Sequence, residues 1–329
     1  MWADGLLLPN LHKALPVIGN LMATPKYILT FFLLIVYVAA LGQTKTKSSK
    51  IDSIKSDKDV FAFVRQHFRG YDGKESFDNY RNETRQVADS LNVRNWVKAD
   101  IDNNGELDLL VFRADRLPNI FSILSFGDKF EIASAKYHCK YQFMYPVVTT
   151  LNNQEVILLY SQDQIDYDRN KKHFIYTKLA SDTLIVKDKH FVNYVQAPRR
   201  NEIENIEIIN DGICEGNCPK INISINTKTF LNKCSKELYW DNKPKQFKGQ
   251  LTKEEINHII SLLNYSNFTD LNEYYEVGCT DQTTTTLTIT FNNGQTKTIK
   301  DYGSSGNFTL AEIYKIAYGV KWTEEKGSR

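Results

Sequence analysis

Apolar and polar residues alternate along several short runs between about residue 95 and residue 197, and polar breaks separate the runs. Alternation of this kind predicts β-strands with one buried face. Asn152-Asn153 and Ser181-Asp182 have the composition of hairpin turns. We therefore expect a mainly antiparallel sheet with at least about six strands. Examples of the expected strands are Leu107–Phe112, Ile120–Phe126, Val147–Leu151, Glu155–Tyr160 and His173–Leu179.

The pattern before these strands predicts short helices. Ser56 can cap a helix over Asp57–Phe68. Its apolar residues recur at helical spacing and predict one buried face, formed by Val60, Phe61, Val64 and Phe68. A second helix is expected over Phe77–Leu91. Together these features predict a first domain over residues 57–198.

The last third of the chain has a different order of elements. Strands are expected at Ile203–Ile209, Lys220–Asn226, Glu237–Trp240, Thr284–Phe291 and Thr296–Asp301, with Asn293-Gly294 as the turn between the last pair. Two capping boxes, Thr252–Glu255 and Thr309–Glu312, predict helix starts. The first helix would bury Ile256, Ile259, Ile260 and Leu263, and the second would run to about Tyr318. The prediction is a β-β-β-α-β-β-α domain over residues 202–320, and an α+β class for the whole chain.

The N-terminal segment has the plan of a secretory signal. Lys26 precedes an apolar run, and Ala40 and Gly42 are small residues in front of Gln43. The run has about 16 residues, fewer than the roughly 20 that a spanning helix needs. We expect cleavage near Gln43 and export to the periplasm or the exterior. The alternative is an uncleaved membrane anchor.

Other segments near the ends are not expected to belong to a folded domain. Residues 1–42 are interpreted as a leader and signal, and Met22 would give a more conventional start than Met1. Residues 43–56 are rich in Lys, Ser, Thr and Asp and predict a disordered tether. Residues 321–329 are interpreted as a tail.

Charge and cysteine content narrow the class of protein. The formal net charge is +2 and no basic stripe is visible, so nucleic acid is not expected as a partner. All five cysteines follow the signal, and in an oxidising compartment they are disulfide candidates.

No pair of His or Cys residues has the spacing of a zinc site. The sequence also has no Gly-x-Ser-x-Gly elbow, phosphate-binding loop or dinucleotide fingerprint, so no catalytic residue is assigned.

One loop could hold a cation. Asp100, Asp102, Asn104 and Asp108 stand at positions 1, 3, 5 and 9, with Gly105 at position 6. Oxygen side chains at this spacing can surround Ca²⁺. The loop is not an EF-hand, because position 12 is a valine. It resembles the Asp-x-Asp-x-Asn-Gly-x-x-Asp loops of calcium-binding β-propeller-type repeats, although it occurs once here. The alternative is a tight turn whose carboxylates accept backbone amides.

A second loop, Asp211–Pro219, contains two cysteines and two glycines between predicted strands. Cys214 and Cys218 are close enough in sequence to form a disulfide across a turn. Cys234–Cys279 would then be the second disulfide and Cys139 a free thiol, although four cysteines allow three pairings. Two other interpretations remain: a redox pair with unusual spacing, and a nest of glycine amides that binds an anion.

The Cys214-x-Gly216-x-Cys218-Pro219 motif resembles the signature of a bacterial domain of unknown function. The Thr-rich strand, the Gly294 turn, Asp301-Tyr302-Gly303 and the closing helix follow in the same order. Lys220 departs from the pattern, and there is no lipid-attachment cysteine after the signal. The resemblance implies an exported protein with no assigned activity.

The leading functional hypothesis is a non-enzymatic exported module that binds a protein or an envelope component through a disulfide-stapled domain. One alternative is a hydrolase with its site between the two domains. The other is a calcium-stabilised adhesion or scaffold module. A His–carboxylate pair or a carboxylate pair in a cleft would favour the hydrolase.

Overall fold

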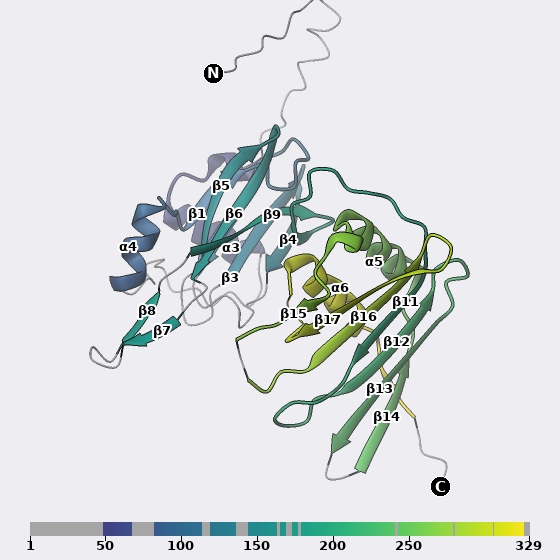
Figure 1. Cartoon of the computed structure of the whole chain (residues 1–329). Coiled ribbons are helices and arrows are strands. Elements are labelled where there is room, and N and C mark those ends of the chain that lie inside the picture. Colours follow the sequence, from purple (N-terminus) through teal and green to yellow (C-terminus); the bar gives the residue numbers. More distant parts are fainter. Residues whose placement is uncertain are drawn as a thin grey trace, which may run out of the picture. The chain divides into compact units, whose positions relative to one another are not determined.

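The structure, a computed structural model, describes residues 49–67, 82–113, 119–135, 144–162, 165–168, 173–176, 179–240, 243–278, 280–304 and 306–325. Residues Ser48–Arg329 form one compact unit. Among the described residues, no helix combines the length and apolar character that crossing a membrane requires. The structure is mostly antiparallel sheet with few helices, which agrees with the α+β class expected from the sequence (Figure 1).

The described part begins with the short helix η1 (Lys50–Ser53), followed by α3 (Asp57–His67) and α4 (Asn82–Ser90). The predicted α3 is confirmed, and Ser56 Oγ accepts the Asp59 N–H at 3.3 Å as its cap. Phe68 and the first part of the predicted Phe77–Leu91 helix lie outside the described residues. The buried side of α3 comprises Val60, Phe61, Phe63 and Val64.

The predicted β-region is two four-stranded antiparallel sheets and a separate hairpin, rather than one larger sheet. The first sheet has the order β1 (Trp96–Ala99), β2 (Asp108–Arg113), β3 (Asn119–Phe126) and β4 (Lys129–Ala135). The second has the order β10 (His190–Asn193), β9 (Leu179–Lys187), β6 (Gln154–Gln162) and β5 (Met144–Leu151). The hairpin pairs β7 (Ile165–Asp168) with β8 (His173–Tyr176). Strand β2 is buried on both of its faces.

The packing of strand β2 shows this directly. Leu109 and Val111 pack with α3, whereas Leu110 and Phe112 join a core to which both four-stranded sheets contribute. A strand covered on both faces has a continuous apolar run instead of an alternating one. One face of β2 therefore contributes to the core between the two sheets, and the other face contributes to the core beneath α3.

Of the two turns predicted for this β-region, one is correct. Asn152 and Asn153 have φ values of 51° and 62° and connect β5 to β6. The Ser181-Asp182 turn is wrong, since both residues lie inside β9 and pair with β6. The Asp182 carboxylate accepts the Asn193 side-chain amide at 3.3 Å, so a polar residue that resembled a turn signal has a partner within the sheet.

The C-terminal region is an eight-stranded sheet with helices packed on it (Figure 1). Its order is β15 (Tyr274–Tyr275), β17 (Gln295–Tyr302), β16 (Thr284–Phe291), β11 (Ile203–Asn210), β12 (Lys220–Asn226), β13 (Asn232–Trp240), β14 (Lys243–Gly249) and β18 (Thr323–Glu324). Within the described part of this sheet, β15 and β17 pair in parallel and the other neighbouring strands pair antiparallel. The β14, β15 and β18 strands are additional to the expected β-β-β-α-β-β-α order.

The helices of this region are α5 (Lys253–Tyr265) and α6 (Phe308–Tyr318), with the short η2 (Phe268–Asp270) between them in sequence. The capping box at Thr252 and Glu255 is confirmed. The capping box predicted at Thr309 is wrong, because the helix cap lies two residues earlier, at Asn307, whose Oδ1 accepts the Leu310 N–H at 2.8 Å. Glu312 is thereby available for contacts outside its own helix.

Candidate functional site

The Asp211–Pro219 loop is closed by a disulfide between Cys214 and Cys218, whose Cα atoms are 6.0 Å apart. The side chains at the end of β11 fix the start of the loop. Asn210 Oδ1 accepts the Gly212 N–H, and Asp211 Oδ1 accepts the N–H groups of Ile213 and Thr284. The disulfide therefore closes a loop whose first residues are already held by hydrogen bonds.

Gly212 is required by this geometry. Its φ is +69°, and a Cβ atom there would lie 2.8 Å from the backbone nitrogen of Lys220. Its amide is bound to Asn210, so this group is not available to the anion nest that the glycines suggested. The loop exposes the side chains of Glu215 and Asn217 to solvent, and also that of Ile213, which is apolar and 73% exposed.

Cys234 is a buried free thiol in the structure. It donates to Asn232 Oδ1 at 3.6 Å, and burial raises its pKa to about 11. Cys139 and Cys279 lie outside the described residues. The free thiol at Cys234 differs from the pairing with Cys279 that the sequence analysis expected.

The candidate calcium loop joins β1 to β2 and brings three of its four predicted ligands together. Carboxylate oxygens of Asp100, Asp102 and Asp108 all lie within 4.8 Å of one another. The fourth predicted ligand, Asn104, is arranged differently. Its Oδ1 accepts the Glu106 N–H at 2.7 Å, and its Nδ2 donates to Asp102 and to the Ser125 carbonyl.

Each of these three carboxylates accepts hydrogen bonds from backbone N–H groups. Asp102 accepts the Asn104 N–H at 3.2 Å. Asp100 accepts the N–H groups of Asn104 and Gly105. Asp108 is fully buried, and it accepts the N–H groups of Ile101, Asp102 and Ser125. These bonds form the tight turn that was the alternative to a cation site, and they leave lone pairs on each carboxylate for a hard cation.

Burial makes the ionised form of this cluster unfavourable. It raises the pKa of Asp102 to about 6 and that of Asp108 to about 7, and the proximity of other carboxylates adds to the effect. An oxygen-only donor set of this charge fits Ca²⁺ better than a soft metal ion. A cation bound there would offset the repulsion between the carboxylates.

The loop also contacts strands on either side of it. Asn103 exchanges two hydrogen bonds with the backbone of Glu155 on β6, at 3.0 and 3.3 Å. The Ile101 carbonyl accepts the Val186 N–H of β9 at 3.4 Å. Glu106 accepts the Gly127 N–H at 2.6 Å in the turn between β3 and β4. The loop thus connects the two four-stranded sheets, which the sequence analysis did not predict for Asn103 or Glu106.

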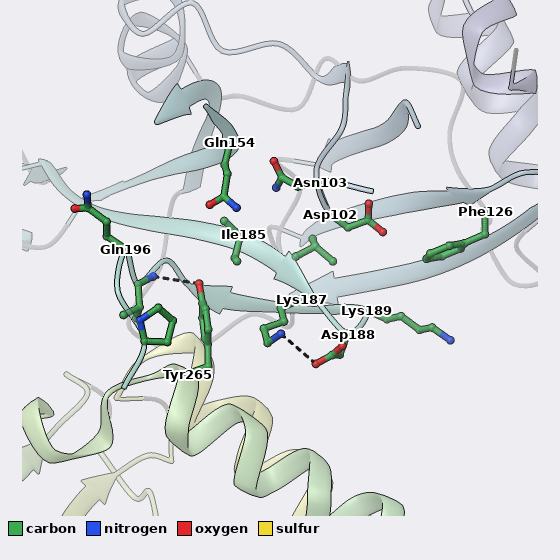
Figure 2. A pocket seen from close by; sticks show the side chains of 13 residues that line it. Asp102, Asn103, Phe126, Gln154, Ile185, Lys187, Asp188, Lys189, Gln196 and Tyr265 are labelled. Atoms are coloured by element: carbon green, nitrogen blue, oxygen red, sulfur yellow. Dashed lines mark hydrogen bonds and ion pairs between the residues drawn. The ribbon is translucent and has the colours of Figure 1, made fainter. Parts of the chain in front are cut away.

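One wall of a pocket of about 580 Å³ is formed by this loop (Figure 2). The polar and aromatic side chains that line it include Asp102, Asn103, Phe126, Gln154, Lys187, Asp188, Lys189, Gln196 and Tyr265. Tyr265, the last residue of α5, fixes the opposite wall by accepting the Val195 N–H at 3.1 Å. The Lys187 ammonium lies 5.5 Å from the centre of the Tyr265 ring and 3.7 Å from the Asp188 carboxylate. The pocket therefore combines groups from distant parts of the sequence.

A histidine pair also forms where the sequence analysis found only separate histidines. The His190 and His258 rings are 4.8 Å apart between centroids, and His190 Nδ1 lies 2.6 Å from the Glu312 carboxylate. Glu312 lines a smaller cavity of about 180 Å³ with Ser134 and Lys315, but His190 does not line it. Only the fold brings these residues together, since they lie on β10, α5 and α6.

Comparison with curated proteins found no match, and comparison with solved structures found none either. Residues 206–318, which include the disulfide loop and helices α5 and α6, match the family model of a domain of unknown function (DUF6438), in agreement with the unknown-function domain expected for this part of the chain.

Proposed function

We propose that this chain is an exported, non-enzymatic binding protein that takes up an envelope component in the pocket between the candidate calcium loop and Tyr265. The observation that carries the proposal is the pocket itself. Its volume of about 580 Å³ lies within the range of small-ligand sites, and aromatic, amide and charged side chains converge on it.

The charges of the lining indicate the chemistry of the ligand. Lys187 and Lys189 are balanced by Asp102 and Asp188, so the pocket has no strong preference for an anion or a cation. The side chains of Gln154 and Gln196 offer both hydrogen-bond donors and acceptors. Phe126 is 40% exposed and supplies an apolar surface. These features suit a polar ligand without strong net charge, such as a neutral saccharide.

Calcium has a structural role in this proposal. Asp100, Asp102 and Asp108 would hold the ion, and it would stiffen the loop that connects the two four-stranded sheets. Asp102 also lines the pocket, so the ion would fix one pocket wall. The disulfide has the corresponding role in the C-terminal region.

Binding can be tested with neutral oligosaccharides, using a polyamine and a polyphosphate as charged comparisons. The melting temperature should rise with at least one neutral saccharide and should not rise with the charged probes. The Gln154→Ala/Gln196→Ala double variant should lose the rise, whereas Ser224→Ala on the exposed face of β12 should retain it. A shift produced only by the charged probes, or one unaffected by the double variant, would refute the proposed pocket.

The calcium role has a separate test. With about 1 mM CaCl₂, the concentration range of extracellular calcium modules, the melting temperature of the wild type should rise. Asp100→Ala/Asp102→Ala should abolish that rise, and Asp89→Ala, which removes an exposed carboxylate on α4, should not. If the wild type does not respond, the loop is a turn without a cation function.

Export is tested by N-terminal sequencing of the protein from its native host. The mature chain should begin near Gln43 and be recovered outside the cytoplasm. An intact apolar segment on a membrane-bound form would show the anchor alternative to be correct.

The hydrolase alternative has one observation in its favour, the His190–Glu312 pair beside the smaller cavity. A general base must reach the proton it removes, and the cavity is lined by Glu312 rather than His190. The test is ester and peptide hydrolysis by the wild type and by His190→Gln. A wild-type activity that His190→Gln abolishes would overturn the non-enzymatic proposal.

A further inference from the structure

The turn between β9 and β10 rests on helices α5 and α6 through a small group of ionisable residues. His190 begins β10, His258 lies on α5, and Glu312 lies on α6. The Glu312 carboxylate is only 8% exposed, and it contacts His190 Nδ1 at 2.6 Å and Lys315 Nζ at 3.0 Å. We call His190, His258, Glu312 and Lys315 the latch.

We infer that the latch is a pH-sensitive contact, which holds the β9–β10 hairpin on α5 and α6 when one histidine is charged and releases it when both are charged. The inference does not depend on the proposed ligand pocket or on calcium. It depends on how many positive charges the neighbouring groups can balance.

The first proton has a suitable place. If His190 is protonated, its Nδ1–H faces the buried Glu312 carboxylate at 2.6 Å, and a charge-assisted hydrogen bond forms. Lys315 already contacts both oxygens of that carboxylate. One added charge therefore strengthens the contact between β10 and α6.

The second proton has no comparable place. His258 Nε2 is buried and has no hydrogen-bond partner among the described residues. Its ring lies against His190, so the two imidazolium groups would repel each other at 4.8 Å between ring centroids. Burial and the neighbouring His190 lower the pKa of His258.

The surrounding charges do not supply the missing anion. The charged groups that act on His258 from the β9–β10 turn and from α6 are Lys187, Asp188 and Glu312, together with His190 when it is protonated. Lys315 pairs with the Glu312 carboxylate, so that carboxylate is shared between His190 and Lys315. In the same turn Lys189 pairs with Glu131 of β4, so that carboxylate is already neutralised. Protonation of both histidines would therefore leave the charge on His258 uncompensated in a contact that is mostly buried.

The direction of the pH effect follows from the lowered pKa of His258. Below its ordinary value of 6.5, the open form takes up a proton that the closed form resists. The contribution of His258 to the closed contact is therefore fully present above about pH 6.5 and is lost as the pH falls below it. Release of the β9–β10 hairpin would also strain the hydrogen bond between Asn193 and the start of α6. In that bond the Asn193 side-chain carbonyl accepts the Phe308 N–H at 2.8 Å.

Hydrogen exchange on the full-length protein tests the latch. Amide protection of peptides covering residues 184–194 and 307–318 is compared at about pH 7.5 and about pH 5.5, after correction for intrinsic exchange rates. We expect protection in both peptides to fall by up to about tenfold at the lower pH, since one proton shifts the equilibrium by up to tenfold per pH unit below about pH 6.5. Unchanged wild-type protection would refute the latch.

Two variants and a matched control establish which residues are responsible. His258→Gln should keep the protection at low pH, and so should His190→Gln, because neither variant can hold two imidazolium charges. The control is His67→Gln, which removes another histidine whose pKa burial lowers but which packs on Phe63 and Phe130 away from the latch. The control should lose protection at low pH like the wild type. If it behaves like His258→Gln, or if both latch variants still lose protection, the inference is wrong.

Discussion

Two strand-connecting loops in this molecule are held in a fixed conformation by different interactions. The loop from Asp100 to Asp108 joins β1 to β2 and is held by hydrogen bonds from amides to buried carboxylates. The loop from Asp211 to Pro219 joins β11 to β12 and is closed by a disulfide. Both begin with an aspartate that accepts amides from residues further along the loop.

The difference lies in what each loop stabilises. The disulfide links residues four apart, so it constrains mainly its own loop. The carboxylate loop also contacts β6, β9 and the turn between β3 and β4, so its order affects both four-stranded sheets. We conclude that damage to the carboxylate loop should spread further than damage to the disulfide loop.

The largest effect is expected from Asp108→Ala. This change leaves the amides of Ile101, Asp102 and Ser125 without their acceptor in a fully buried position. Unsatisfied buried donors cost about 1–3 kcal/mol each, so the free energy of unfolding should fall by about 3 kcal/mol or more. Urea unfolding monitored by circular dichroism measures the change.

Asp108→Asn is the matched control for this prediction. It retains one acceptor oxygen and introduces no cavity, so it should lose less than the alanine variant. Equal losses would mean that the shape of the side chain, and not the accepted hydrogen bonds, holds the loop. The comparison of the two loops would then lose its physical basis.

A smaller effect is expected when the disulfide is removed. For a loop of five residues, the chain-entropy relation gives about 2 kcal/mol for Cys214→Ser/Cys218→Ser. Hydrogen exchange in the two four-stranded sheets should not change, since the loop belongs to the C-terminal sheet. A loss well above 3 kcal/mol, or exchange that increases across all the sheets, would show that the disulfide is not a local constraint. Loss of a thiol-dependent activity from a stable variant would instead support the redox interpretation.

Local sequence was enough to predict both loops and the elements beside them. Alternation of Ile206 and Ile208, and of Ile221, Ile223 and Ile225, predicted β11 and β12 because one face of that sheet is covered and the other is exposed. Thr252 and Glu255 predicted the start of α5 because a capping box needs only residues three apart.

Features decided by distant residues were not predictable. Asp182 resembled a turn residue until Asn193 supplied its partner inside the sheet. Glu312 was predicted to complete a capping box, but its carboxylate instead contacts His190 and Lys315. Strand β14 contains Lys243, Pro244 and Lys245 and has no apolar alternation, so its pairing with β13 could not be recognised from its own residues. Likewise, the pocket wall formed by Tyr265 depends on tertiary packing.

Asn103→Ala should reduce stability somewhat less than removal of the disulfide. It tests the link between the two four-stranded sheets. Asn103 has a φ of 57°, and an alanine at this position would have a strained backbone. The Asn103 side chain also exchanges two hydrogen bonds with the backbone of Glu155. The expected loss is about 1–2 kcal/mol, from backbone strain and lost hydrogen bonds. Thermal and urea unfolding provide the measurement.

Asn103→Gly separates the two causes, because glycine accepts the positive φ but cannot bond to Glu155. Gly216→Ala in the disulfide loop, where φ is +119° and nothing lies within 4 Å of the added Cβ, gives strain without any lost side-chain bond. If Asn103→Gly is as stable as the wild type, the bonds to Glu155 contribute nothing and the loop does not link the sheets through them.

The smallest effect concerns Cys234, and it asks whether the C-terminal region has a second covalent link. In the structure the thiol is buried, and its pKa of about 11 leaves about one molecule in a thousand as thiolate at pH 8. A thiol reagent should therefore not modify Cys234 in the native protein and should modify it fully after unfolding without reductant.

Peptide mapping under non-reducing conditions should find Cys214 joined to Cys218 in both the native and the unfolded protein. If mapping instead joins Cys234 to Cys279, the C-terminal region has a long-range covalent link as well as a local one. The disulfide network would then extend beyond its own loop, as the carboxylate loop does, and the contrast between the two loops would fail.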